Sequence, residues 1–481
     1  MSNILVRRNV TQNPDFGCRT TGRDTLIYMY RRVNEFVETR GAGVAFTLAL
    51  AALIWAIGVR RYAGTTSLFD LQFLMGPTVQ ALVERGTSCA LLQLHNFQLH
   101  DVQQTSLEFC AHRRLLVPAL LALASLSGLS VAVFAALKAL FASAVLVFSL
   151  RIVAAGLSGR WRLAPYAAFV LIVANPWFLS QTVALEVEEA YAIPLFAIVT
   201  ALLVRPVFLG SHRVLAATAL ALFAIVMLKS SYAAVAIVLA GALARSAPFP
   251  RRALKWLAPA VLAGLASVAL SNAATSGRFV TGSSIDWWNA YKGNNALTSQ
   301  FYSESKLDQL PLHLPPSTHF ADEWDFDRFF RAETVSFFKR EPKVVVGLAA
   351  ERLWNYFLRV DFVVSAAPGD QAGGRILSWR WWFLANVPAR LLFLGALVSA
   401  LWWWKSQRLA RLWPLVILAS AAPHLLGFAY FRHVTPLLVP SALVLVSVIA
   451  ASNSRSARSA GERGQDRSDE SVMRAASHCA S

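Results

Sequence analysis

Long apolar runs separated by short polar segments make up most of this chain. From residue 42 onward, the runs are roughly 16 to 27 residues long, about the length that a helix needs to cross the ~30 Å hydrocarbon core of a bilayer. Hydrophobic residues account for 56% of the sequence and charged residues for 15%, whereas a soluble domain carries about 25% charged residues. The pattern predicts an all-α polytopic membrane protein.

We predict about ten transmembrane helices with both termini in the cytoplasm. They lie at residues 42–59, 131–157, 163–179, 190–204, 214–228, 231–244, 254–270, 387–404, 412–429 and 434–450. The connections that follow the second, fourth, sixth and eighth helices are all basic, as is typical of cytoplasmic loops. Arg60 and Arg61 follow the first helix and depart from this rule. The net charge of +18 is explained by membrane topology, and because no basic and aromatic module is present, nucleic-acid binding is not predicted.

Residues 114–130 are apolar but have two interpretations. Pro118 interrupts the run, and a Ser-Gly-Leu-Ser sequence closes it. If the segment crossed the membrane, the later acids at positions 186–189 would lie in the cytoplasm and most later charges would conflict with the topology rule. We expect it to lie along the outer interface or to dip into the membrane and return.

The predicted spans divide the chain into five parts. These are a basic cytoplasmic segment at 1–41, a transmembrane module at 42–270 with a first outer loop at 62–130, a larger outer segment at 271–384 between the seventh and eighth spans, C-terminal transmembrane helices at 385–451, and a disordered cytoplasmic tail at 452–481. Phenylalanines on one face and charges on the other predict an amphipathic helix at 322–341, and Pro342 ends it and begins another. We expect amphipathic helices in the first outer loop as well. Cys89 and Cys110 in that loop form either a disulfide or two unpaired thiols.

Acidic side chains at two outer turns are candidate catalytic groups. Asp70, about ten residues beyond the first span, is either a base that takes a proton from an acceptor hydroxyl or an ordinary solvated loop acid. Glu186, Glu188 and Glu189 lie within four residues beside the bilayer, where acids are costly unless they are solvated or paired. The first and last share a helical face. They either help to hold an acceptor or a cation, or simply snorkel to the interface.

Three cations lie at the outer ends of spans. Lys229, Arg432 and His433 are placed where a lipid phosphate would sit, with its tail in the bilayer. Their charge would stabilise a departing polyprenyl phosphate. Contact with ordinary phospholipid head groups is the alternative.

A third group mixes aromatic faces with amide groups, as sugar-binding sites do. Its members are Trp287, Trp288, Asn289, Tyr291, Lys292, Asn294 and Asn295. A tryptophan-rich interface belt explains the aromatic residues equally well, but it does not explain the Gly-Asn-Asn sequence.

The chain resembles the GT-C superfamily of integral-membrane glycosyltransferases, which includes protein O-mannosyltransferases and lipid A aminoarabinose transferases. Three features over residues 42–450 carry the resemblance. They are Asp70 in a long loop that ends in His-Arg-Arg-Leu-Leu-Val-Pro, the segment Trp-Asn-Ala-Tyr-Lys-Gly-Asn-Asn at 288–295 before an amphipathic helix, and Arg-His-x-x-Pro-x-x-x-Pro at 432–440. The chain departs from the pattern in having three glutamates where the second-loop acid is usually aspartate.

The resemblance implies an enzyme with its active site at the outer face of the bacterial inner membrane. The donor would be a polyprenyl-phosphate-linked sugar and the acceptor an envelope glycan, lipid or protein, with inversion at the sugar carbon. Asp70 would be the base, Glu186 or Glu189 the second-loop acid, and Lys229 and Arg432 donor-phosphate contacts. No cofactor is implied, and a divalent metal is not excluded. A transporter or lipid flippase is the main alternative function, and a membrane scaffold is another.

Overall fold

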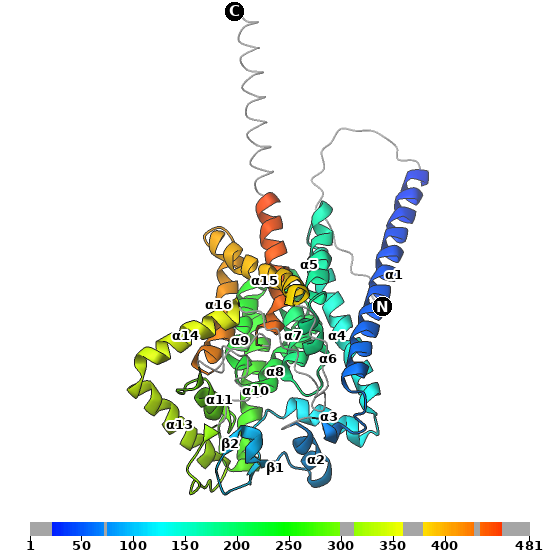
Figure 1. The fold of residues 1–481 in the computed structure, drawn as a ribbon. Helices are drawn as coiled ribbons and strands as arrows, with labels where there is room; N and C mark the ends of the chain where they lie inside the picture. Colours follow the sequence, from blue (N-terminus) through cyan, green and yellow to red (C-terminus); the bar gives the residue numbers. More distant parts are fainter. Residues whose placement is uncertain (1–21, 72–74, 299–311, 359–378, 428–432, 455–481) are drawn as a thin grey trace, which may run out of the picture.

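Helices dominate the structure, a computed structural model that describes residues 22–71, 75–298, 312–358, 379–427 and 433–454 (Figure 1). Five helices within these residues are long and apolar enough to span a membrane. They are the Gly43–Arg61 part of α1 (Gly22–Arg61), α4 (Val131–Ala154), α10 (Pro250–Ser276), α16 (Arg408–Leu426) and the final helix His433–Ser454. The chain is therefore an all-helical membrane protein in its main architecture.

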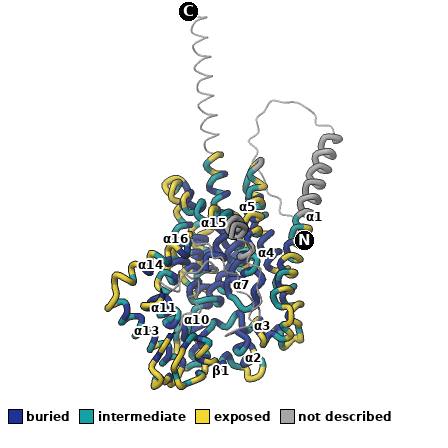
Figure 2. The backbone as a smooth tube through the Cα atoms, in the orientation of Figure 1, coloured by how far each residue is buried: buried dark blue, intermediate teal, exposed yellow. Residues whose placement is uncertain are grey.

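Shorter apolar helices complete the bundle. These are α5 (Ala164–Val173), α6 (Pro176–Val183), α7 (Glu188–Val204), α8 (His212–Leu228), α9 (Tyr232–Ser246) and the Asn386–Trp402 part of α15 (Trp379–Trp402). Short 3₁₀ turns precede α5 and α8, namely η3 (Gly159–Leu163) and η4 (Pro206–Gly210). Most of α7 is buried, and this helix lies at the centre of the bundle (Figure 2).

The predicted single span at 163–179 is two helices. Helix α5 ends at Val173 and α6 begins at Pro176, which has no N–H to continue the hydrogen-bond ladder. The Asn175 side chain accepts a hydrogen bond from the Phe178 N–H at 3.3 Å and so caps the second helix. The sequence Asn-Pro inside an apolar run therefore divides it.

The first outer loop and the later polar segment pack together at one end of the bundle, near the bottom of Figure 1. Their helices are η1 (Leu68–Asp70), α2 (Met75–Arg85), η2 (Leu94–Phe97), α3 (Leu116–Leu126), α11 (Asp286–Lys292), α13 (Glu323–Arg340) and α14 (Pro342–Phe357). We call this end of the bundle the acidic end, because these helices and the loops between them carry acids such as Asp70 and Glu323. With 11 residues, α3 is about 16 Å long, too short to cross the hydrocarbon core. Its length agrees with the expectation that residues 114–130 do not form a full span, which stays a prediction. Helices α13 and α14 confirm the predicted amphipathic pair.

The structure contains four short strands that the sequence did not predict, and one of their two pairs joins the two polar segments. Strand β1 (Ala90–Gln93) pairs antiparallel with β3 (Ser106–Phe109), and β2 (Leu99–His100) pairs parallel with β4 (Leu312–His313). A disulfide links Cys89 to Cys110 beside the first pair.

An aromatic core lies under these strands. Phe97 stacks on Phe109 with ring centroids 4.8 Å apart, and Phe326 contacts both rings from α13. The carboxylate of Glu323 accepts backbone hydrogen bonds from Cys110 and Ala111, each through Oε2 at 3.0 and 2.9 Å. These contacts fix the end of the first outer loop against α13.

Candidate active site

Glu186 lies between α6 and α7 and is paired with the end of α1. Its Oε1 is 2.5 Å from Arg61 Nη2, and the Tyr62 hydroxyl donates a hydrogen bond to its other oxygen. The same hydroxyl accepts a hydrogen bond from the Leu185 N–H at 2.7 Å. Burial opposes ionisation of the Glu186 carboxyl, but the Arg61 charge and the Tyr62 hydrogen bond outweigh it and hold its pKa below the usual value. Glu186 is therefore a carboxylate at neutral pH.

The two neighbouring glutamates begin α7 and each pairs with a different segment. Glu188 forms an ion pair with Arg113, which precedes α3. Glu189 Oε1 lies 2.5 Å from Nζ of Lys229, the residue after α8. Acids in the first turn of a helix are also favoured by the helix dipole. The three glutamates therefore tie α1, α3 and α8 to the start of the central helix.

A further hydrogen bond connects this cluster to the later polar segment. Ser230 Oγ donates to Asp286 Oδ1 at 3.2 Å, and Asp286 Oδ2 accepts from the Ser283 N–H at 2.8 Å. The turn after α8 is thus held directly against the start of α11, which carries the predicted sugar-binding residues.

Asp70 is exposed at the end of η1, close behind the first long apolar helix. Its Oδ2 accepts hydrogen bonds from the Ser67 N–H at 3.0 Å and from Thr66 Oγ1 at 3.3 Å. Gly76 lets α2 approach closely, because a Cβ there would lie 2.1 Å from the Phe69 carbonyl oxygen. One carboxylate oxygen of Asp70 therefore takes part in this local cap. Within the described residues, its side chain makes no hydrogen bond or ion pair to the three glutamates.

Four of the predicted sugar-binding residues are buried, namely Trp288 and Lys292 in α11 and Asn294 and Asn295 after it. Trp288 Nε1 donates to the Phe97 carbonyl at 3.2 Å, and Lys292 Nζ lies 4.2 Å from the Trp288 ring centroid. Trp287 and Asn289 are half-buried, and Arg331 lies over the Trp287 ring at 5.5 Å. The indole of Trp287 is thus the more accessible of the two.

The two asparagines after α11 hold the backbone together. Asn294 Nδ2 donates to the Leu426 carbonyl at 2.7 Å, and its Oδ1 accepts from Arg352 at 2.5 Å. Asn295 Oδ1 accepts from the Leu297 N–H at 2.9 Å. A sugar-binding role for this segment stays a prediction, and its present contacts fasten α11 to α14 and α16.

Of the two cations predicted at the turn before the final helix, the structure describes only His433. Arg432 lies outside the described residues. His433 is buried at the start of the final helix, where its ring stacks on His424 with centroids 3.8 Å apart. Because Asn294 contacts Leu426 nearby, His433 belongs to the same end of the bundle as α11.

Arg61, Tyr62 and Arg113 are members of the charged cluster that were not among the predicted site residues. The sequence signal for Arg61 was its departure from the predicted charge pattern after the first span, and in the structure this cation is paired with Glu186. Within the described residues, no group of three or more His, Cys, Asp or Glu side chains is arranged to hold a metal ion.

These contacts define an α-helical membrane protein with a charge-paired polar site at one end of its bundle. The chain matches no family model, no curated protein and no solved structure.

Proposed function

We propose that this protein is a membrane glycosyltransferase that transfers a sugar from a polyprenyl-phosphate-linked donor to a cell-envelope acceptor. The reaction would take place on the outer face of the bacterial inner membrane, with inversion at the sugar carbon. The observation that carries the proposal is the gathering, at the acidic end, of Asp70, the glutamate–cation pairs, the α11 segment and His433 from distant parts of the chain.

The distribution of charge supports the proposed orientation. The connections at 155–163, 205–213, 245–252 and 403–411 contain arginine or lysine and no acid. Arg245 and Arg411 lie close enough to Arg408 to repel its charge, so basic residues of separate connections share one end of the bundle. Basic ends face the cytoplasm, so the acidic end would face the periplasm or the cell exterior.

Each proposed role follows from charge and position. Asp70 would remove the proton from an acceptor hydroxyl as that oxygen attacks the anomeric carbon. The bond between this carbon and the phosphate oxygen would break on the opposite face, and the polyprenyl phosphate would leave with the bonding electrons. Lys229, Arg432 and His433 would stabilise the phosphate charge. Lys229 retains donors for this role beyond its bond to Glu189, because an ammonium group has three.

Asp70→Asn tests the proposal without disturbing the fold, because the asparagine amide oxygen can still accept the Ser67 and Thr66 hydrogen bonds. A deletion strain complemented with this variant should lack an envelope sugar that the wild type restores, with the protein at equal level. Loss of a general base lowers rates by about 100-fold or more. Mass spectrometry of envelope glycans, lipid A and proteins provides the measurement.

Asp101→Asn is the matched control, since Asp101 is an exposed acid of the same loop that pairs with His313. It should restore the sugar fully. The deletion strain should also accumulate the polyprenyl-phosphate sugar donor. Restoration of the sugar by Asp70→Asn would show that Asp70 is not the base. An unchanged glycan profile in the deletion strain would rule out the proposed function.

A further inference from the structure

Helix α14 has its polar and apolar sides reversed relative to a helix that faces water. From Val344 to the end of the helix, every exposed residue is apolar or glycine. Val346 is 70% exposed and Trp354 is 60% exposed. The two charged residues of the same stretch, Glu351 and Arg352, are half-buried and buried. An exposed helix face without a polar side chain indicates a surrounding that is not water.

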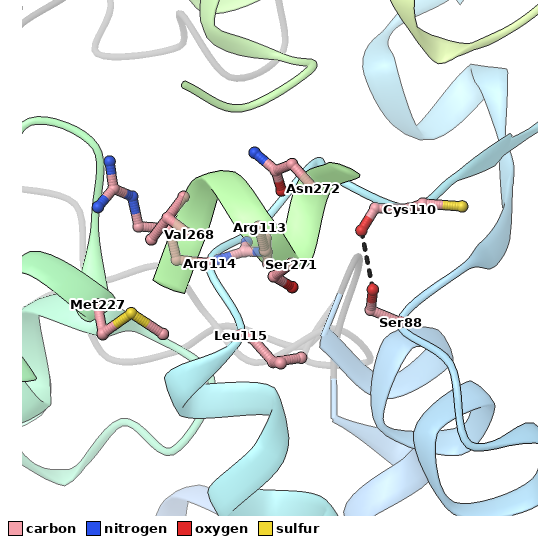
Figure 3. Close-up of a pocket in the computed structure, with 9 residues that line it drawn as sticks. All are labelled: Ser88, Cys110, Arg113, Arg114, Leu115, Met227, Val268, Ser271 and Asn272. Carbon is pink, nitrogen blue, oxygen red and sulfur yellow. Dashed lines mark hydrogen bonds between the residues drawn. The ribbon is translucent and has the colours of Figure 1, made fainter. Parts of the chain in front are cut away.

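Arg352 shows why the charged side of α14 faces the protein. Its Nη1 donates to the Leu425 carbonyl in α16 at 2.6 Å. Arg114, at the end of the first outer loop (Figure 3), is used in the same way, since it donates to the carbonyls of Val226 and Thr281. Buried arginines thus fasten segments of the acidic end to one another. In α14 this contact leaves the apolar face turned outward.

Helix α13, directly before α14, has the ordinary orientation of an amphipathic helix in water. Its Arg328 and Arg331 are exposed, whereas Phe326 and Phe330 are buried. The two helices meet at Pro342 and form a corner that projects from the side of the bundle (Figure 1). The exposed surface therefore changes from charged to apolar at this corner, as it would where a chain passes from water into a membrane.

Three cations lie at this corner. Lys339, Arg340 and Lys343 are all exposed, and none of them forms an ion pair with a described residue. Glu341 is the one acid among residues 339–343. We call the three cations the basic corner. Cations beside an apolar helix face are typical of helices that lie in the membrane interface and attract anionic lipids.

Two further features favour lipid as the cover of α14. The helix packs against α16, a candidate membrane span whose Leu418 and Leu426 are also exposed. Helix α3, which is likewise too short to span, exposes Leu123 and Leu126 at the acidic end. With 16 residues, α14 is about 24 Å long, shorter than the ~30 Å hydrocarbon core. It can therefore enter one leaflet without crossing the membrane.

We propose that α14 lies in the leaflet at the acidic end, with its exposed face among the acyl chains, and that the basic corner binds the head groups of anionic phospholipids. Pro342 then marks the depth of the membrane surface. The charged face of α13 stays in water above the head groups. The inference does not depend on the transferase reaction.

Fluorescence quenching in lipid nanodiscs tests the position of α14. The purified full-length protein, with Cys18 and Cys479 changed to serine, carries a bimane label at Val346→Cys. Phospholipids with brominated acyl chains should quench this label, and iodide in the water should not. Ala332→Cys, at an exposed position of α13, is the matched control and should show the reverse.

The same label tests the head-group preference. In a mixture of phosphatidylglycerol and phosphatidylcholine, brominated phosphatidylglycerol should quench Val346→Cys more strongly than an equal amount of brominated phosphatidylcholine, by about twofold or more, because each nearby Lys or Arg attracts anionic lipid. Lys339→Gln combined with Lys343→Gln should remove this difference. Arg85→Gln combined with Arg328→Gln removes equal charge from other exposed positions of the acidic end and should leave the difference unchanged.

Several results would count against the proposal. Quenching of Val346→Cys by iodide would place α14 in water. Quenching by neither agent would show that a protein surface, such as a second copy of the chain, covers the helix. Either result would overturn the proposal. Equal quenching by the two brominated lipids, or an unchanged preference without Lys339 and Lys343, would overturn the binding of anionic head groups by the basic corner.

Discussion

Lys229 Nζ lies 2.5 Å from Glu189 Oε1, and the two side chains differ greatly in exposure, 26% for the lysine and 1% for the glutamate. The pair joins the residue after α8 to the first turn of α7. Water reaches the cation but scarcely reaches the carboxylate. The carboxylate therefore depends on its partner more than the lysine does.

This asymmetry predicts unequal costs for the two halves of the pair. Lys229→Met leaves a buried carboxylate without its lysine and should lower the free energy of unfolding by about 3 kcal/mol. Glu189→Leu should cost less, because the lysine can turn to water. The double variant should recover most of the loss. Chemical unfolding in detergent measures all three, and additive losses would show that the two groups are not coupled.

The pH dependence of stability should depend on Asp327 in α13. Burial, with a smaller contribution from Asp286, raises the pKa of its carboxyl to about 7, although the Trp287 N–H donates to it at 3.2 Å. The folded state then binds a proton more tightly than the unfolded chain, whose aspartate pKa is about 3.9. This contribution is present below pH ~4 and is lost as the pH rises towards 7.

Asp327→Asn should flatten the fall in unfolding midpoint between pH ~4 and 7. Thermal unfolding over that range, with Asp325→Asn as a control two residues earlier on the same helix, gives the comparison. An identical slope for wild type and Asp327→Asn would contradict the prediction.

The disulfide between Cys89 and Cys110 should stabilise the first outer loop. The two cysteines are 21 residues apart, a loop for which chain-entropy arithmetic gives about 3 kcal/mol. Replacing both by serine should therefore lower the unfolding midpoint, and reduction of the wild type should have a similar effect. Alkylation with and without reductant, followed by mass spectrometry, checks the bond. Detection of two free thiols in the wild type would contradict the predicted stabilisation by the disulfide.

Gly76→Ala should displace Asp70 without touching it. A Cβ at this position would lie 2.1 Å from the Phe69 carbonyl oxygen and 2.3 Å from that of Leu71, so α2 and η1 must separate. We expect sugar transfer to fall towards the level of Asp70→Asn. Gly241→Ala is the control, because nothing lies within 4 Å of its added Cβ. Full activity of Gly76→Ala would show that this contact does not position Asp70.

Cysteine labelling tests the proposed orientation. In a chain with Cys18 and Cys479 changed to serine, Glu84→Cys on α2 should react with an impermeant maleimide in intact cells. Ser406→Cys, in a basic connection, should react only after the membrane is opened. Both positions are exposed in the structure. The reverse pattern would place the acidic end in the cytoplasm and exclude the proposed reaction site.

Hydrophobic patterning was sufficient to predict the order of the apolar helices. Sustained apolar runs predicted α4, α8 and α9 to within three residues, and the predicted span at 254–270 lies inside the longer α10. The run that contains Pro118 forms only the short helix α3. The Asn-Pro break between α5 and α6 was missed because hydropathy does not register a lost N–H. The strands were missed because each is only two to four residues long and gains its stability from a remote partner.

The candidate site was predictable in its residues but not in its contacts. Acids beside the bilayer pointed to Glu186 and Glu189, yet spacing could not reveal that Arg61 and Lys229 hold them. Asn294 and Asn295 suggested ligand binding from composition, whereas in the structure their amides hold backbone carbonyls and N–H groups. The partner of a polar group depends on tertiary packing, and a local sequence pattern does not specify that partner.

The parallel pairing of β2 with β4 has a consequence for biosynthesis. Leu99 is opposite Leu312 in this ladder, so its partner strand leaves the ribosome more than two hundred residues later. At a synthesis rate of ~5–20 residues per second, the earlier strand waits on the order of ten seconds or more with an open edge. A newly made chain truncated before residue 312 would expose that edge, and chaperones and proteases would recognise it as unfinished.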